Sequence, residues 1–471
     1  MKRTIFLGTI IFGICILAIS LIYAQTKPPQ ISGVVKKDPE KPSIAVPDFR
    51  GAGDAQRFMS TLNGTLFSEL QNSGQLTMVA KTLYPLQIPQ QPSDFHPPAN
   101  GRSQGPWLTD WAGPPPNANF LAFGYAATQN NQLVLYGWLY DVRQANTTAA
   151  QLIGKVYVGS IDEDGAKKVA REFAADILKY FGAESLIGTK IYFVSNRSGN
   201  KEIWSMDYDG SNQKQFTSYR TITSFPAISP DGTKIAFTTY PVGRGSSGKA
   251  VTEGQPQIYV HSLETGRKLV YYNQQASMNA ASDFMPDSRH LLIYSTAGGT
   301  GFSQIFLTDL DGAGLRPITH SRALDVEAKV NPKTGTDIVF VSGRGGPPQI
   351  YRMNIDGTDV ARLSTGEGDA VNPAWSPNGQ QIAFAWTRGY EPGNFNIFVM
   401  DVASRDVVQL THGAGRNEHP NWAPDGIHIV FSSTRGRNTQ IYSTLANGSA
   451  PVQQLTTQGN NDNPVWSRAT H

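Results

Sequence analysis

Short apolar runs recur at regular intervals over the part of the chain that follows residue 190. Five runs have three consecutive apolar residues, and they stand at 235–237, 292–294, 338–340, 382–384 and 429–431. Apolar side chains on consecutive positions are typical of a β-strand covered on both faces, as when sheets stack face to face. The pattern therefore predicts a series of small stacked sheets.

A turn motif precedes these runs. Its core form is Pro-x-aromatic-Ser-Pro-Asp-Gly, and the clearest copies begin at Pro226, Pro373 and Pro420. The second proline fixes its own backbone angle, Asp or Asn follows it, and glycine takes the left-handed conformation. The turn prolines at 230, 286, 332, 377 and 424 are separated by 56, 46, 45 and 47 residues. A fixed period of this length is the signature of a repeat architecture.

Each repeat contains four predicted strands. The third begins with a polar residue followed by isoleucine and an aromatic residue, and the fourth ends near a threonine, as in Gln215-Phe216-Thr217. Third strands begin at 202, 257, 304, 349, 396 and 440, which gives six copies. Four short strands in each unit, repeated six times, predict an all-β six-bladed propeller at 189–468.

The two ends of the repeat series complement each other. The first copy starts at its second strand, near Ile191, and the last copy ends with an extra strand at 463–467. A solenoid would need capping repeats, and none is visible. We therefore expect the C-terminal strand to complete the first blade, which closes the ring and removes its open edges.

A small α/β domain is predicted at 43–183, so the whole is a two-domain α+β chain. Strands are expected near 44–49, 76–79, 120–125, 133–140 and 152–157, and helices at 55–73 and 164–181. The first helix is predicted from apolar residues that share one face. The Pro-rich segment 85–117 is long for a loop, so we expect it at the surface or partly disordered. The residues of the apolar helix face are Phe58, Met59, Leu62, Leu66 and Leu70.

The N-terminus carries an export signature. Lys2 and Arg3 precede an uninterrupted apolar stretch, which predicts a signal peptide at 1–24. The stretch is also long enough to span a bilayer, so an uncleaved anchor is the alternative. Residues 25–42 are rich in Pro, Lys and Gln and are expected to form a linker. The single cysteine, Cys15, lies in the leader, so the mature chain would contain no disulfide.

Charge and motif content narrow the function classes. The chain has 40 basic and 37 acidic residues, a net charge of +3 and no basic run, so nucleic acid is not an expected partner. No Gly-x-Ser-x-Gly nucleophile motif occurs, and the eight histidines lack metal-ligand spacing. The Gly-rich insertion at 241–256 is expected to be a surface loop and not a phosphate cradle. We expect no catalytic residue, no cofactor and no metal.

The residues that enter the innermost strands are the candidate binding site. In a propeller these positions lie at the mouth of the central channel, and a rim with polar and aromatic groups offers anchors for a partner. The alternative is that they are solvated turn residues that cap backbone groups. Trp375, Trp422 and Trp466 recur at one register and are expected to pack between blades. The candidates are Phe225, Ala281, Glu327, Asn372, His419 and Asn463, with Asp325, Glu418 and Asp462 beside them.

Several segments resemble the TolB family of periplasmic propeller proteins of the Tol–Pal system. They are Ile-Ala-Val-Pro-Asp-Phe at 44–49, Leu-Gln-Asn-Ser-Gly at 70–74, the strand end at 139–142, the junction at 189–195 and the blade motifs at 373–379 and 464–467. The resemblance covers nearly the whole mature chain. It implies a non-catalytic periplasmic scaffold that supports outer-membrane integrity and constriction at cell division. It also implies that a Pal-like peptidoglycan-associated lipoprotein binds the propeller and that a TolA-like protein binds the N-terminal region. Independently of the resemblance, the closed ring favours a monomer.

Two other function classes stay open at this point. An exported propeller enzyme acting on carbohydrate would need two carboxylates converging in the channel, and Glu327 with Glu418 or Asp462 are the candidates. A small-molecule-sensing propeller would need a buried ligand pocket.

Overall fold

The computed structural model describes residues 41–100, 102, 104–240, 242–244, 250–252, 254–271, 276 and 278–469. The predicted leader at 1–24, nearly all of the linker at 25–42 and much of the insertion at 241–256 lie outside these residues. Within the described ranges, no helix combines the length and the apolar character needed to cross a membrane.

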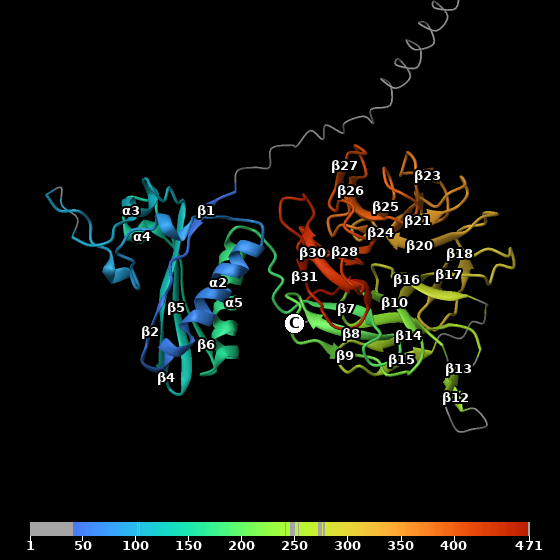
Figure 1. The fold of residues 1–471 in the computed structure, drawn as a ribbon, viewed down its shortest axis with the longest axis horizontal. Helices are drawn as coiled ribbons and strands as arrows, with labels where there is room; N and C mark the ends of the chain where they lie inside the picture. Colours follow the sequence, from blue (N-terminus) through green and yellow to red (C-terminus); the bar gives the residue numbers. More distant parts are fainter. Residues whose placement is uncertain are drawn as a thin grey trace, which may run out of the picture. The chain divides into compact units, whose positions relative to one another are not determined.

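A mixed sheet organises the N-terminal region (Figure 1). It runs in the order β3-β1-β4-β5-β6, and β2 also pairs with β4. The pairs that involve β1 and β2 are parallel, whereas β4, β5 and β6 are antiparallel. Asn130 and Asn131 both have positive φ, 48° and 58°, as a tight two-residue hairpin turn requires. The strands are β1 (Ser43–Ala45), β2 (Arg50–Ala52), β3 (Thr77–Met78), β4 (Phe120–Gln129), β5 (Gln132–Asp141) and β6 (Gln151–Gly159).

Two helices cover one face of this sheet. A 3-10 turn, η1 (Gly53–Phe58), leads into α2 (Met59–Asn72), so the helix expected at 55–73 is α-helical only from Met59. The second helix, α5 (Glu163–Tyr180), begins where the Asp162 carboxylate accepts the Gly165 N–H. Their apolar faces form one buried cluster with the sheet, and fully or almost fully buried members from the helices include Leu62, Leu66, Leu70, Phe173 and Ile177.

The Pro-rich segment packs on part of the other face. Most of its described residues lie at the surface, as expected, but several of its apolar side chains are buried. Phe95, Leu108 and Trp111 are buried against the sheet residues Phe123 and Tyr140. Large aromatic side chains contribute enough buried apolar area to order a segment that has little regular structure. Its short elements are η2 (Lys81–Leu83), η3 (Pro92–Asp94) and α3 (Leu108–Ala112), and α4 (Thr147–Ala150) follows β5.

Six four-stranded antiparallel sheets form the propeller, as the repeats predict. Blade 1 is β32 (Asn461–Trp466), β7 (Lys190–Ser195), β8 (Glu202–Asp207) and β9 (Lys214–Gln215). Blade 2 is β10 (Thr223–Ile228), β11 (Lys234–Thr239), β14 (Gln257–Ser262) and β15 (Lys268–Tyr271), with the hairpin β12 (Val242–Arg244) and β13 (Ala250–Thr252) inserted. Blade 3 is β16 (Asn279–Phe284), β17 (His290–Ser295), β18 (Gln304–Asp309) and β19 (Arg316–Pro317).

The remaining blades repeat the arrangement. Blade 4 is β20 (Asp325–Val330), β21 (Asp337–Ser342), β22 (Gln349–Asn354) and β23 (Ala361–Arg362). Blade 5 is β24 (Ala370–Trp375), β25 (Gln381–Trp386), β26 (Asn396–Asp401) and β27 (Val407–Gln409). Blade 6 is β28 (Asn417–Trp422), β29 (His428–Ser433), β30 (Gln440–Leu445) and β31 (Gln453–Gln454).

Neighbouring blades are joined by the repeated tryptophans and by close backbone contacts. The indole N–H groups of Trp375 and Trp422 donate to backbone carbonyls of the preceding blade at 3.1 Å. At Gly357, φ is 86° and an added Cβ would lie 2.4 Å from the Ile318 carbonyl oxygen of the neighbouring blade. The ring closes where β32 pairs with β7, and Trp466 lies opposite Ile191.

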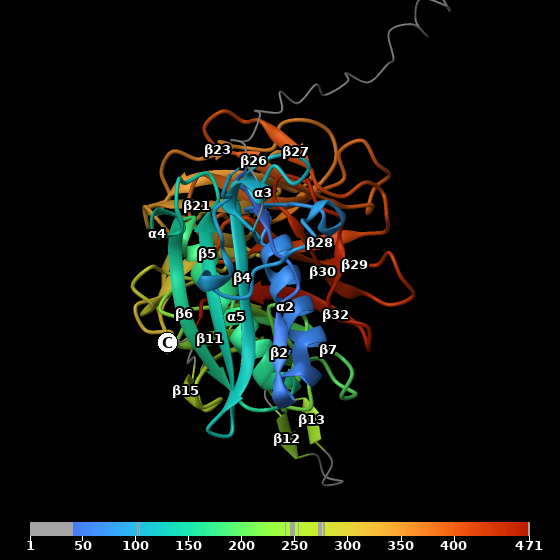
Figure 2. The ribbon, with the colours of Figure 1, turned by 90° about the vertical axis from the view of Figure 1, so that its left-hand side faces the viewer.

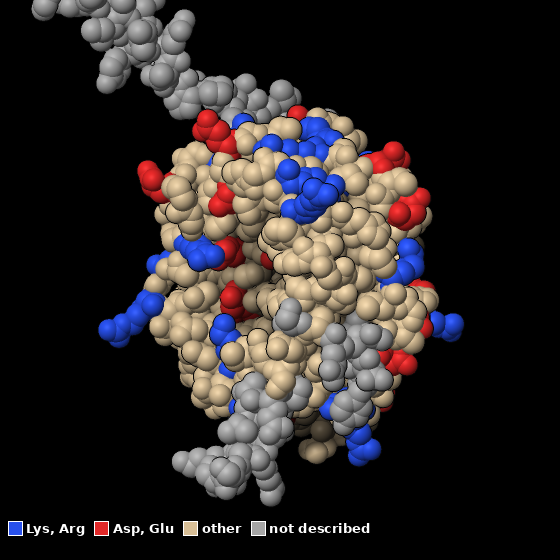
Figure 3. All heavy atoms as spheres, turned by 90° about the vertical axis from the view of Figure 1, so that its right-hand side faces the viewer, with Lys and Arg blue, Asp and Glu red and all other residues tan. Residues whose placement is uncertain are grey.

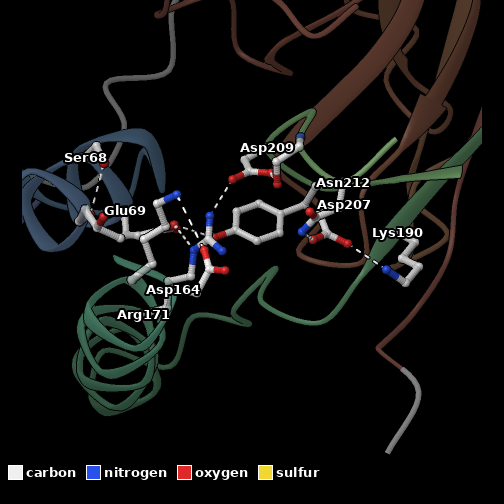
Figure 4. Close-up of polar contacts among 12 residues, drawn as sticks. Ser68, Glu69, Asp164, Arg171, Lys190, Asp207, Asp209 and Asn212 are labelled. Carbon is white, nitrogen blue, oxygen red and sulfur yellow. Dashed lines mark hydrogen bonds and ion pairs between the residues drawn. The ribbon is translucent and has the colours of Figure 1, made fainter. Parts of the chain in front are cut away.

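A polar cluster links α2 and α5 to the β8–β9 turn (Figure 4). Arg171 of α5 bonds Glu69 of α2 at 3.1 Å and also bonds Asp209 of the turn. The Tyr208 hydroxyl donates to the Glu69 carboxylate. Burial raises the pKa of Glu69 even though Tyr208 and Arg171 pull it down. The cluster therefore ties the helices to the first blade through a largely buried carboxylate.

Candidate functional site at the channel mouth

A backbone bulge sets the side chains at the channel mouth. The third residue of five innermost strands has a left-handed φ between 49° and 55°, and the strand pairing shifts register there. A bulge turns one side chain out of the regular ladder. Asparagine tolerates this conformation, whereas it is costly for bulky residues. The five residues are Phe225, Glu327, Asn372, His419 and Asn463.

These residues converge on one pocket. The pocket has a volume of about 70 Å³, and the five bulge residues line it together with Ala281. Tyr294 adds an aromatic wall, with its ring centroid 6.0 Å from that of Phe225. On the face shown in Figure 3, a hollow opens with Asp and Glu side chains inside it, which agrees with the carboxylates near this pocket. The site thus has an aromatic wall on one side and polar groups on the other.

Hydrogen bonds connect the polar groups across four blades. The Asn372 N–H and side-chain amide donate to the Glu327 carboxylate at 2.7 and 3.0 Å. The His419 N–H donates to the Asn372 side-chain oxygen at 3.2 Å. The His419 ring nitrogen Nδ1 lies 2.9 Å from Asp462 Oδ1. The side chains at the mouth are therefore held in place before any partner arrives.

His419 and Asp462 form an ion pair at neutral pH. Burial alone would lower the pKa of His419, but the charge and hydrogen bond of Asp462, with the charges of Glu327 and Glu418, raise it to about 9. Burial raises the pKa of Asp462, but His419 outweighs this effect and holds the pKa well below its usual range. Glu418 pairs with Arg416 at 2.5 Å, so its charge is also balanced.

The sequence model of the "TolB beta propeller domain" matches residues 177–385 and 365–471, which is more than half of the chain. The chain belongs to the TolB β-propeller family. The family match covers all six blades.

Known TolB proteins extend the comparison. The chain is 32% identical over 246 residues to a TolB homologue of Chlorobium luteolum and 33% identical over 226 residues to one of Chlorobium chlorochromatii. These matches cover 52% and 48% of this chain and 51% and 46% of the relatives, so the chain spans about half the length of each. The crystal structure of TolB from Acinetobacter baumannii superposes with a TM-score of 0.69 at 22% identity. It covers 91% of this chain and 97% of that chain, so the likeness of fold includes the N-terminal region.

Seven of the eight polar and aromatic candidates lie at or beside the mouth of this TolB-type propeller. Five line the pocket, and Glu418 and Asp462 stand next to it on β28 and β32. Asp325 does not: its side chain is fully buried and bonds Arg344 at 2.9 Å and Ser321 at 2.7 Å. The prediction that the Asp325 side chain is available to a partner at the channel mouth is therefore wrong.

The physical reason is a clamp that recurs in three blades. An arginine two residues after a serine of the second strand bonds that serine and the first residue of the innermost strand. Arg197 holds Asn461 and Arg435 holds Asn417, both at 3.0 Å, in the way that Arg344 holds Asp325. The Ser-x-Arg spacing at 195–197, 342–344 and 433–435 is the sequence signal that would have identified Asp325 as structural.

Sequence reasoning also missed Tyr294 and Lys329, which line the pocket. Tyr294 pairs with Ala280, so a small residue stands opposite its ring. Lys329 donates to the Ser282 carbonyl oxygen. The repeat predicts an aromatic residue at position 294, but it does not show that this side chain reaches the pocket, and no repeat signal marks Lys329. Among the residues that the structure describes, no three His, Cys, Asp or Glu side chains gather in a way that would hold a metal ion.

Proposed function

We propose that this protein is a non-catalytic periplasmic scaffold of the Tol–Pal system, whose channel mouth docks a Pal-like peptidoglycan-associated lipoprotein. The observation that carries the proposal is the convergence of five bulged residues on one pre-ordered pocket in a TolB-type propeller. Membership of the family supports the biological setting. The protein would act in the periplasm as a monomer.

The pocket suits a protruding loop of a folded partner. Its volume of about 70 Å³ admits the tip of a side chain and not a whole ligand. Phe225 and Tyr294 offer an apolar wall of the kind that anchors interface hot spots. Glu327 and the His419–Asp462 pair supply fixed polar partners that need no rearrangement on binding.

The remaining parts of the proposal follow from the resemblance to the family. The region at 25–42 would contact a TolA-like inner-membrane protein. Through both contacts the protein would support outer-membrane integrity and constriction at cell division.

The test is calorimetric binding of mature protein (residues 25–471) to the purified soluble domain of the lipoprotein from the same bacterium. Phe225→Asn and Glu327→Asn remove the anchor and the charge while keeping a residue that tolerates the left-handed backbone. We expect each to weaken binding about tenfold or more. Glu264→Asn changes an exposed carboxylate in the β14–β15 turn and serves as the matched control.

Binding that survives both substitutions at the channel would refute the docking face. No binding by the unaltered protein would refute the scaffold proposal, and it would return attention to carbohydrate or small-molecule ligands of the channel.

A further inference from the structure

The C-terminal end of helix α2 is bonded by a histidine of the propeller. Helix α2 lies beside α5 on one face of the N-terminal sheet and ends at Asn72 (Figure 2). The last carbonyl oxygens of a helix have no partner within it and need one elsewhere. The N–H groups of Ser73 and Gly74 and the Ser73 hydroxyl supply partners for residues 69–71. The Asn72 carbonyl oxygen accepts instead from Nε2 of His428 in blade 6, at 2.8 Å.

Both ring nitrogens of His428 face oxygen atoms that can only accept. Nδ1 lies 2.6 Å from Oδ2 of Asp425, and the other oxygen of that carboxylate accepts the N–H groups of Ile427 and His428 at 2.9 and 3.0 Å. A carboxylate and a carbonyl group carry no proton, so each contact needs an N–H on the ring. A neutral imidazole has one N–H, whereas an imidazolium has two. The geometry is therefore that of a positively charged His428.

The surroundings of the ring favour this charge. The side chains of His428 and Asp425 are only 12% and 4% exposed, so their attraction is weakly screened. The ring also lies at the negative end of the α2 dipole, where a cation is stabilising. Burial lowers the pKa of His428, but the Asp425 carboxylate and the Asn72 carbonyl outweigh burial and raise it above its ordinary value of 6.5.

Other titratable groups line the same cleft as His428. Of the charged side chains that line it in the described part of the chain, Asp425 is the one that bonds the ring. The others come from α2, α5 and the segments that lead into and through blade 1, and several of them bond one another. They are Glu69, Asp164, Lys167, Lys168, Arg171, Glu172, Glu184, Tyr208 and Asp209.

A second histidine at the same position of the repeat provides a comparison. His290 begins β17 as His428 begins β29, and its Nδ1 bonds Asp287 of the preceding turn at 2.5 Å. Its Nε2 lies 3.1 Å from Asp309 of the same blade. The turn motif therefore places an imidazole between two acceptors in both blades. In blade 6, one of these acceptors belongs to the N-terminal region.

We propose that His428 is a pH-sensitive latch, which holds the end of α2 on blade 6 while its ring carries two protons and releases it when one is lost. The proton on Nε2 is the one that leaves, because the Asp425 carboxylate is the stronger acceptor and keeps the Nδ1–H. The lone pair of Nε2 then faces the Asn72 oxygen, and the two acceptors repel. Since the pKa is raised, the latch is closed below about pH 6.5 and opens as the pH rises through the raised value.

Two further contacts confine the opening to the end of α2. Gly74 packs so closely on Leu445 of β30 that an added Cβ would lie 2.8 Å from the leucine Cδ1. Arg171 bonds Asp209 of the first blade. Neither contact involves the His428 ring, so we expect residues 69–75 to loosen while the N-terminal region stays attached.

Hydrogen–deuterium exchange of mature protein (residues 25–471) tests the latch. It is measured at about pH 6 and about pH 9.5, and the rates are corrected for the intrinsic effect of pH. Protection of the amides at 69–75 should fall about tenfold at the higher pH, whereas protection in β25 should not change.

Two substitutions at position 428 use residues that other blades carry there. His428→Gln, as Gln381 in blade 5, removes the charge and should give low protection at both pH values. His428→Lys keeps a cation and should give high protection at both, since Lys234 of blade 2 bonds its turn aspartate, Asp231, at 3.0 Å. His290→Gln is the matched control and should keep the wild-type response.

Nuclear magnetic resonance of the histidine ring nitrogens provides a second readout on the unaltered protein. The His428 signals are those that either position-428 variant lacks. Both nitrogens should carry hydrogen at about pH 6, and Nε2 should lose its hydrogen over the same range in which protection falls.

Four outcomes would overturn the proposal. They are unchanged protection at 69–75 in the unaltered protein, the wild-type pH response in either position-428 variant, loss of that response in His290→Gln, and a neutral His428 ring at about pH 6. None of these measurements involves the lipoprotein, so the latch and the docking proposed for the channel fail independently.

Discussion

Single residues decide what the channel mouth presents, because five positions share one left-handed backbone conformation. Asn372 and Asn463 suit this conformation, whereas Phe225, Glu327 and His419 adopt it at an energetic cost. Strain of this kind persists where the surrounding structure fixes it, and it is common at functional sites. The sequence identified these positions from the repeat alone, because each precedes the same segment in its blade.

The His419–Asp462 pair predicts a pH dependence of stability. The pKa of His419 is raised from 6.5 to about 9, so the folded protein binds this proton more tightly than the unfolded chain does. The stabilisation is complete below about pH 6.5 and is lost as the pH rises through about 9. We expect the free energy of unfolding in urea to fall by roughly 1–3 kcal/mol over this range.

His419→Asn should remove most of that fall while keeping a residue that accepts the backbone conformation. The comparison is made on urea unfolding curves of both proteins at pH 6 and pH 9.5. An identical pH dependence in the two proteins would contradict the ion pair.

Asp325 predicts a contrast between two substitutions. Asp325→Ala leaves the Arg344 guanidinium without its carboxylate partner and should cost about 3 kcal/mol of folding free energy. Asp325→Asn should stay within about 1 kcal/mol of wild type, because Asn417 and Asn461 hold the equivalent arginines in blades 6 and 1. Urea unfolding measures both, and lipoprotein binding by the Asn variant should be unchanged. Equal destabilisation by Ala and Asn would refute the clamp.

Elements that carry a periodic pattern were predicted well, and elements that depend on tertiary cover were not. Helix α5 differs by one residue at each end from the predicted 164–181, because its apolar face and its cap are both local signals. The Pro-rich segment lacks any period, and its order comes from Phe95, Leu108 and Trp111, which reach a sheet face formed by distant strands. A side chain that is buried by remote strands leaves no periodic trace in its own segment.

The cluster of Arg171, Glu69 and Asp209 predicts that the contact between the two helices and the first blade depends on the Arg171 cation. Arg171→Met removes the cation from two carboxylates, one of which is largely buried, and should cost about 3 kcal/mol. Hydrogen–deuterium exchange should rise in α2, in α5 and in the turn at 208–212, but not in β11 or β25.

The control for this substitution lies on the same helix. Lys167→Met removes an exposed pair with Asp164, where the side chains are 47% and 94% exposed, and should cost less than about 0.5 kcal/mol. Faster exchange throughout the propeller in the Arg171 variant would contradict a local link.

At the scale of the whole molecule, the ring of six blades was predictable because every repeat carries the same four-strand pattern. The strand that the first repeat lacks is the extra strand at the C-terminus, because β32 pairs with β7 and completes blade 1. The residues that line the pocket were predictable only in part. Tyr294 lines it, and the residue paired with Tyr294 in this blade is the small Ala280.

Closure by β32 predicts complementation in trans. Protein that ends at residue 458 exposes the edge of β7 with Ile191 and Phe193, which are otherwise fully buried, so we expect aggregation. A synthetic peptide of residues 459–469, added during refolding, should restore soluble protein with native circular dichroism. A peptide of the same composition in scrambled order is the control. Soluble, folded truncated protein without any peptide would contradict the closure.

The central claim is tested most directly by site-specific photo-crosslinking in the parent bacterium. A photoreactive phenylalanine analogue replaces Phe225 at the channel mouth or Val408 on the outer edge of blade 5. We predict that position 225 captures a peptidoglycan-associated lipoprotein, identified by mass spectrometry, and that position 408 does not. Capture at 408 but not at 225, or no capture of such a lipoprotein at 225 in a strain that makes one, would contradict docking at the channel mouth.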